Sequence, residues 1–230
     1  MTGRDKSQPW PLYQNRWAAA IPVSLGLAIC CLIFFAWLSE QVLKQGTDQF
    51  DAVIRSAVQQ HASPFLTTVM SVITQLGNWQ VMMAGTVYLL LVCWYRQGRG
   101  LLLLVLVTMA GVGILDGTLK LVFHRMRPDP FIGSKPSTYS FPSGHALVSL
   151  CFYTLVAGIL SLRSDRHWNR VLIWTVASLL SALVGLSRIY LGVHWPSDVL
   201  AGWCFGTLWA LAWWAFGARL RLKRAGPQAF

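Results

Sequence analysis

Three short clusters of polar residues stand out from a chain that is otherwise mostly apolar, and each lies at the edge of a long apolar run. Together they supply three cations, two imidazoles, one carboxylate and a Ser-Gly pair at a predicted helix start. In chain order these residues are Lys120, Arg127, Ser143, Gly144, His145, Arg188, His194 and Asp198. Cations and helix-start N–H groups bind phosphate oxygens, and an imidazole can attack phosphorus or carry a proton. The inventory indicates binding and transfer of a phosphoryl group.

The cations and the Ser-Gly pair suit the charge of that group. A transferring phosphoryl group spreads negative charge over its oxygens, so catalysis is mostly positioning and electrostatic stabilisation. Arginine binds two oxygens with its planar fork, whereas lysine acts as a point charge. Ser143 and Gly144 open an apolar run, so their backbone N–H groups, the hydroxyl and the helix dipole predict an anion site.

The spacing of the clusters fits a known three-part pattern at every fixed position. The parts are K-x6-RP at 120–128, PSGH at 142–145 and SR-x5-H-x3-D at 187–198. The sequence therefore resembles the type 2 phosphatidic acid phosphatase family, which also includes the vanadium haloperoxidases and glucose-6-phosphatase. Its hydrophobic layout is similar to that of the family's small bacterial six-helix members. One short motif occurs by chance, but three in order at membrane edges are a specific signal.

The resemblance implies a role for each motif residue. His194 is the nucleophile that forms a phosphohistidine, and Asp198, one helical turn later, orients its ring. His145 protonates the leaving oxygen and then acts as the base for water. The implied phosphate-binding residues are Lys120, Arg127, Ser143, Gly144 and Arg188. No metal or other cofactor is predicted, because no Asp/Glu/His cluster resembles a magnesium or zinc site.

The composition predicts an all-α integral membrane protein. The 230 residues are 55% hydrophobic and 12% charged, whereas typical soluble domains have about 25% charged residues. Helices are the expected spans, because no alternating pattern suggests a barrel. The six predicted spans are residues 18–38, 81–94, 101–123, 143–162, 171–186 and 196–216. They form one membrane domain, 18–217, between a polar segment, 1–17, and a basic tail, 218–230.

A different pattern separates the first two predicted spans. Apolar residues recur at helical spacing over 50–58, with Asp51 and Arg55 between them, which predicts an amphipathic helix on the membrane surface. A second short helix is expected from Pro64 to about Gln75, followed by a turn into the membrane. The alternative is one continuous span over residues 65–90.

The distribution of basic residues predicts the orientation. Twelve of the 19 Lys and Arg lie in segments 1–17, 95–100, 163–170 and 218–230, which six spans place on one side. The positive-inside rule makes that side cytoplasmic. Both termini are then cytoplasmic, and all three motifs face the periplasm or exterior across a bacterial plasma membrane.

The predicted span 101–123 holds an acidic residue and a glycine pair. Asp116 lies one turn before Lys120, and an ion pair between them is the preferred interpretation. Gly113 and Gly117 have the spacing that permits close helix contact.

Other polar residues near the motifs are given structural rather than catalytic interpretations. Arg125 and Lys135 are interpreted as solvated or lipid-facing charges. Tyr190 and Trp195 are interpreted as interfacial anchors.

The expected activity is hydrolysis of a lipid phosphate or diphosphate whose tail stays in the bilayer. Undecaprenyl diphosphate is favoured, because it is released at the outer leaflet, while phosphatidylglycerophosphate, phosphatidic acid and lipid A remain alternatives. A non-catalytic protein that binds or transports lipid phosphates is the alternative from another class. Nucleic-acid binding has only the net charge of +11 in its favour, and the oligomeric state stays open.

Overall fold

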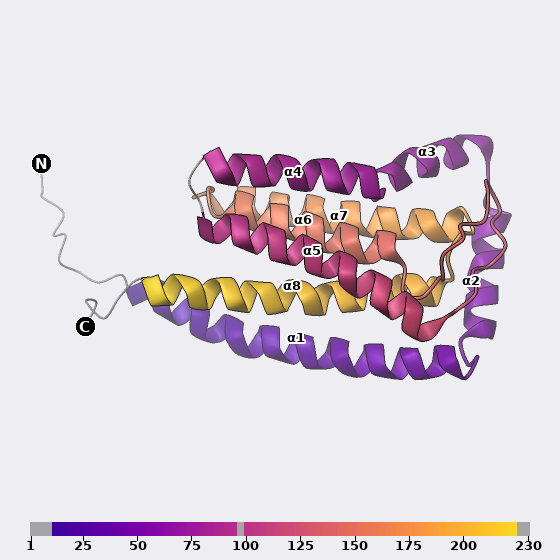
Figure 1. Ribbon diagram of the computed structural model, residues 1–230, viewed down its shortest axis with the longest axis horizontal. Coiled ribbons are helices and arrows are strands. Elements are labelled where there is room, and N and C mark those ends of the chain that lie inside the picture. Colours follow the sequence, from indigo (N-terminus) through magenta and orange to yellow (C-terminus); the bar gives the residue numbers. More distant parts are fainter. Residues whose placement is uncertain (1–10, 96–98, 225–230) are drawn as a thin grey trace, which may run out of the picture.

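A computed structural model describes the backbone of residues 11–95 and 99–224 and the side chains of residues 22–95 and 99–215. Within these ranges the chain forms helices joined by loops, as the all-α prediction required (Figure 1). The helices are α1 (Pro11–Leu43), α2 (Asp48–Gln60), α3 (Pro64–Gln75), α4 (Trp79–Tyr95), α5 (Arg99–Phe123), α6 (Gly144–Ser161), α7 (His167–Tyr190) and α8 (Pro196–Arg224). The predicted terminal segments fall partly outside the described residues, which exclude 1–10 and 225–230.

The long axis of the molecule is followed by α1, α4, α5, α6, α7 and α8, while α2 lies across one end (Figure 1). Helix α6 is at the centre, because it packs against α5, α7 and α8. Its side chains are correspondingly buried, with Leu147 and Cys151 fully enclosed. Helix α1 lies alongside α8 and joins its core through Phe35 and Phe205. The bundle therefore surrounds α6, and its end at α2 contains the loops that carry the motifs.

Five helical segments of the described residues are long and apolar enough to cross a membrane. They are Pro22–Leu43, Pro64–Tyr95, Arg99–Phe123, Gly144–Ser161 and His167–Tyr190. Large apolar side chains on their outer faces are exposed, as lipid contact requires. The chain is thus a multi-pass membrane protein. The predicted sixth span, 196–216, is not among the five. It lies in α8, whose side chains are described only to Ala215, and the count of six stays a prediction.

The segment between α1 and α4 follows the two-helix prediction. Helix α3 begins at Pro64, with the Ser63 hydroxyl accepting the Leu66 N–H as an N-cap. It ends at Gln75, and a turn over 76–78 redirects the chain into α4. The two helices are therefore distinct elements, although together they form one of the apolar segments long enough to span.

Tryptophans of α8 fill glycine positions on its neighbours. Trp203 packs on Gly185 of α7, and Trp209 packs on Gly111 of α5 so closely that no Cβ would fit there. The Trp209 indole N–H also donates to the Thr108 carbonyl at 3.0 Å. Small residues at such contacts let helices approach without a hydrophobic driving force. The helix contact expected at residues 113 and 117 is not found within residues 22–95 and 99–215, where no atom of a neighbouring element comes within 4 Å of a Cβ built at either glycine.

Candidate active site

The three motifs meet at the end of the bundle across which α2 lies (Figure 1). Lys120 is in the last turn of α5 and Arg188 in the last turn of α7. Ser143 immediately precedes α6, and Asp198 is in the first turn of α8. Because α5 and α7 run toward this end while α6 and α8 run away from it, residues distant in sequence become neighbours.

The N-terminus of α6 contacts the ion pair expected on α5. The Lys120 ammonium donates to Asp116 Oδ2 at 2.6 Å, and both side chains are less than one-fifth exposed. A Cβ on Gly144 would lie 2.8 Å from Asp116 Oδ1 and 3.0 Å from Lys120 Nζ. Glycine therefore allows the ammonium to reach the helix N-terminus, where unpaired N–H groups and the dipole also attract anions.

Ser143 offers its hydroxyl but not its backbone N–H. The N–H donates to the carbonyl oxygen of Asp198 at 2.9 Å, so the prediction that it binds an anion is wrong. The hydroxyl is fully buried, finds no hydrogen-bond partner among the described residues and does not cap α6. A buried polar group without a partner is costly unless a ligand supplies one. A phosphate oxygen at the start of α6 would do so.

Arg127 uses most of its guanidinium donors in the ligand-free protein. Its Nε donates to the Thr138 carbonyl at 2.7 Å and its Nη2 to the Thr138 hydroxyl at 3.0 Å. Its Nη1 donates to the Val193 carbonyl at 2.9 Å and contacts His194 Nε2 at 2.8 Å. The loop 124–143 is thus joined to the loop before α8 through one arginine.

The contacts of His194 determine which ring nitrogen carries the proton. Arginine can only donate, so the Nε2 atom facing Arg127 must be the acceptor. The proton then resides on Nδ1, which lies 3.3 Å from Asp198 Oδ2. The same oxygen accepts the Trp195 N–H at 2.9 Å, so Asp198 also caps the first turn of α8. The lone pair of Nε2 is consequently directed toward the motif arginine.

Burial keeps the His194 ring neutral. Its side chain is 2% exposed, and removal from water lowers the pKa of His194 well below the usual 6.5. The positive charges of Arg127, Arg188 and Lys120 lower the pKa further. A neutral imidazole is the form that can act as a nucleophile.

The remaining two motif residues contact the α3 region. Arg188 Nη1 donates to the Thr74 hydroxyl of α3 at 2.7 Å, while its buried Nε has no partner within the part of the chain that the structure describes. His145 is partly buried in the first turn of α6, and a Cβ on Gly77 would lie 3.2 Å from its ring. Sequence reasoning did not identify Thr74, because a single threonine on an apolar helix carries no distinguishing signal.

Arg125 was interpreted as a solvated or lipid-facing charge, and that interpretation is wrong. Its side chain is 12% exposed and lies between two fully buried carboxylates, Asp198 at 2.7 Å and Asp51 at 2.8 Å. Asp51 was placed on the polar face of a surface helix, but it faces inward from α2. Tyr190 is not an interfacial anchor either, since its buried hydroxyl contacts the Thr67 hydroxyl of α3 at 3.0 Å.

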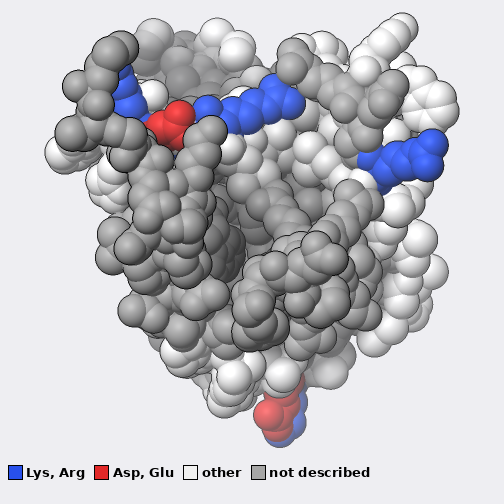
Figure 2. All heavy atoms as spheres, turned by 90° about the vertical axis from the view of Figure 1, so that its left-hand side faces the viewer, with Lys and Arg blue, Asp and Glu red and all other residues white. Residues whose placement is uncertain are grey.

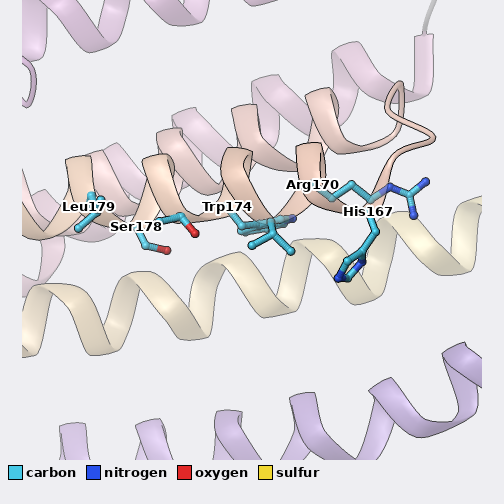
Figure 3. A pocket seen from close by; sticks show the side chains of 7 residues that line it. His167, Arg170, Trp174, Ser178 and Leu179 are labelled. Atoms are coloured by element: carbon cyan, nitrogen blue, oxygen red, sulfur yellow. The ribbon is translucent and has the colours of Figure 1, made fainter.

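Cavities lined by described residues lie at the opposite end of the bundle, which also carries the exposed Arg99, Arg163 and Arg166. Figure 2 shows Lys and Arg side chains spread around the face at this end. One cavity of about 710 Å³ is lined by α7 side chains that include His167 and Trp174 (Figure 3). The motif region is closely packed by comparison, because Ser143 and Asp198 are fully buried.

Comparison with known proteins places this architecture in a family. The family model described as the PAP2 superfamily matches residues 101–221, more than half of the chain. The chain belongs to the PAP2 superfamily. The PAP2 match includes all eight motif residues but not α1 to α4. The family expected from the three motifs is thereby confirmed.

Individual relatives extend the PAP2 assignment to most of the chain. Phosphatidylglycerophosphatase B of Bacillus subtilis is 30% identical over 81% of this chain and 90% of its own length. An undecaprenyl-diphosphatase of Sulfolobus acidocaldarius is 26% identical over 85% of this chain and 91% of its length. The crystal structure of a transmembrane PAP2 type phosphatidylglycerolphosphate phosphatase from Bacillus subtilis matches with a TM-score of 0.76. That match has 28% identity and covers 84% of this chain and 96% of the other.

Proposed function

We propose that this PAP2 protein hydrolyses a lipid phosphate or diphosphate through a phosphohistidine at His194. The observation that carries the proposal is a pair of contacts made by the His194 ring, from Nε2 to Arg127 and from Nδ1 to Asp198. It keeps the lone pair on Nε2 and the proton on Nδ1, facing a buried carboxylate. A ring held in this tautomer can attack phosphorus, and the carboxylate stabilises the positive charge that develops.

The first half-reaction uses the groups around the start of α6. The Ser143 hydroxyl, the Lys120 ammonium and the free Nε of Arg188 bind the phosphoryl oxygens. Arg127 Nη1 moves its hydrogen bond from Nε2 to one of these oxygens, which frees the lone pair. Nε2 then forms a bond to phosphorus as the bond to the leaving oxygen breaks, and His145 gives that oxygen a proton.

The second half-reaction returns the protein to its resting state. Water attacks the phosphohistidine, His145 accepts the proton of the water, and the P–N bond breaks. Inorganic phosphate leaves, and the His194 ring regains its neutral form with the proton on Nδ1. Every group in these steps belongs to the protein, the substrate or water, so the proposed reaction uses no metal ion.

Undecaprenyl diphosphate is the substrate that we favour, with phosphatidylglycerophosphate and phosphatidic acid as further candidates. The two relatives that cover most of the chain are named for the first two of these lipids. Lipid A 1-phosphatase of Rhizobium johnstonii is 31% identical over 50% of this chain, which keeps lipid A as an alternative. All of these substrates share an anionic phosphate head and a tail that stays in the bilayer.

The proposed active site faces the periplasm or exterior. Arg99 begins α5, and Arg163 and Arg166 lie between α6 and α7, so these arginines are at the end of the bundle opposite to the motifs (Figure 1). The positive-inside rule assigns the arginine-rich end to the cytoplasm. The enzyme would then act on head groups of the outer leaflet and release phosphate there.

The alternative from another class is a protein that binds or transports lipid phosphates without turnover. The complete set of His145, His194 and Asp198 favours turnover, since binding alone has no use for a neutral imidazole paired with a carboxylate. Phosphate release by the purified protein separates the two functions.

The test is a rapid-quench experiment on the detergent-solubilised protein with phosphatidic acid and undecaprenyl diphosphate. The unaltered protein should release phosphate and form an acid-labile phospho-enzyme, and His194→Ala should lose both. His124→Ala is the matched control, because His124 is an exposed histidine at the same end of the bundle. Substantial turnover by His194→Ala would remove the assignment of the nucleophile.

A further inference from the structure

Asp51, Arg125 and Asp198 form a connected series of ionic side chains on the Nδ1 side of His194, and all three are buried or nearly buried. Arg125 Nη1 donates to Asp198 Oδ1 at 2.7 Å, and Arg125 Nη2 donates to Asp51 Oδ2 at 2.8 Å. The Thr47 hydroxyl accepts a further bond from Nη2 at 3.0 Å. Both carboxylates are fully buried. Charged groups in such places are costly unless each has partners.

Asp51 also holds the start of α8 directly. Its Oδ1 accepts the Ser197 N–H at 2.8 Å and its Oδ2 accepts the Ser197 hydroxyl at 2.6 Å. The N–H groups of a first helical turn lack partners within the helix, so α2 supplies one from outside. Ser197 adjoins Asp198 in the chain. Asp51 therefore fixes the turn that carries the catalytic carboxylate.

The net charge of Asp51, Arg125 and Asp198 together differs from the net charge of Arg125 and Asp198 alone. Asp198 with Arg125 is neutral overall, and a neutral pair would stabilise a cationic His194 ring poorly. A second carboxylate on the same guanidinium restores a net charge of −1 to the cluster. It also draws the guanidinium toward α2, because the two carboxylates bind different nitrogens of its fork.

We propose that Asp51 is a positioning residue for catalysis, acting through Arg125 and Ser197 on the place and net charge of Asp198. Asp51 lies outside the three motifs and outside residues 101–221, which match the family model. This inference rests on the proposed phosphohistidine function. It assigns to α2 a part in the reaction beyond lying across the end of the bundle.

The test is the steady-state hydrolysis of dioctanoyl phosphatidic acid by Asp51→Asn, which keeps the shape of the side chain and removes its charge. kcat should fall about 15- to 30-fold, the effect of one unit charge about 8–10 Å away at an effective dielectric constant near 20. KM should stay unchanged, because Asp51 contacts no phosphate-binding group. Asp129→Asn is the matched control, since Asp129 is an exposed acid of the neighbouring loop.

A double variant distinguishes charge from simple support. Asp51→Asn/Arg125→Gln removes one charge of each sign and leaves Asp198 with its net charge of −1. Its kcat should exceed that of Asp51→Asn, whereas loss of packing alone would make the double variant the poorer enzyme. An unchanged kcat in Asp51→Asn, or a double variant no better than the single one, overturns the proposal.

A replacement variant covers the case in which Asp51→Asn does not fold, and the unaltered protein tests the proposed function separately. Should Asp51→Asn fail to fold by gel filtration and thermal melting, Arg125→Lys replaces it, because one ammonium cannot span both carboxylates. Arg125→Lys keeps the net charge of −1, so a smaller loss of kcat is expected, from the displaced Asp198 alone. Full activity in Arg125→Lys overturns the proposal. Absence of phosphate release by the unaltered protein would instead refute the proposed function itself.

Discussion

Replacing Gly144 by alanine should weaken phosphate binding without unfolding the protein. The new Cβ would lie 2.8 Å and 2.9 Å from the Asp116 carboxylate oxygens and 3.0 Å from the Lys120 ammonium. These atoms are the ends of flexible side chains, so the pair can retreat while the helices stay in place. The protein should therefore stay folded, and the substitution should change the affinity for phosphate instead.

The expected size of the effect follows from how far the ammonium must move. Ordinary contact would displace Lys120 Nζ by about 0.5–1 Å. At an effective dielectric constant near 20, a shift from about 4 Å to about 5 Å weakens its attraction to one unit of phosphate charge by about 0.8 kcal/mol. A dianion would lose about 1.7 kcal/mol. The inhibition constant of vanadate and KM should therefore rise about 4- to 15-fold.

The assay is vanadate inhibition of phosphate release, measured alongside the melting temperature of each variant. Gly113→Ala is the matched control, because Gly113 lies on the same helix as Lys120 and a Cβ built there has no atom of another described element within 4 Å. It should leave both constants unchanged. An unaltered vanadate constant in a folded Gly144→Ala protein would refute the role given to the contact between Gly144 and Lys120.

Three other outcomes follow from the site and its surroundings. Activity should survive EDTA, and its complete loss with recovery on addition of one metal would contradict the metal-free reaction. Because the pKa of His194 is lowered, its ring should stay neutral as the pH falls through 6.5. The His194 signal in ¹⁵N spectra is identified as the one that His194→Gln lacks. Titration of that signal near pH 6.5 would contradict the expectation. In intact cells a membrane-impermeant maleimide should label Ser137→Cys but not Asp165→Cys, and the reverse pattern would place the site in the cytoplasm.

The sequence allowed the main features of the site to be predicted, because motif spacing and helix direction constrain each other. The motif residues are a Lys, a Ser-Gly pair, an Arg and a His-Asp pair, and they lie at the ends of four consecutive helices. These ends can meet only if consecutive helices run in opposite directions. The ion pair of Asp116 with Lys120 was also predictable, since residues one turn apart face the same side. These features depend on local geometry that repeats in every helix.

Features that depend on packing between distant segments could not be predicted. Nothing near Asp51 in the chain indicates that it meets Arg125, 74 residues away. The Ser143 N–H was expected to be free, because its partner is a carbonyl at the start of α8. The pair Gly113 and Gly117 has a contact motif but faces outward. Spacing along one helix does not show which neighbour, if any, lies opposite.

The distance in sequence between Asp51 and its partners has a consequence for biosynthesis. Ser197, which Asp51 binds, is 146 residues later in the chain. At about 5–20 residues per second, ribosomes make that partner about 7–30 s after Asp51. A carboxylate on a membrane-spanning helix would spend this interval unpaired in lipid. Helix α2 lies across the end of the bundle, where the acid can stay hydrated until α5 and α8 arrive. The order of translation thus favours a surface helix at this point of the chain.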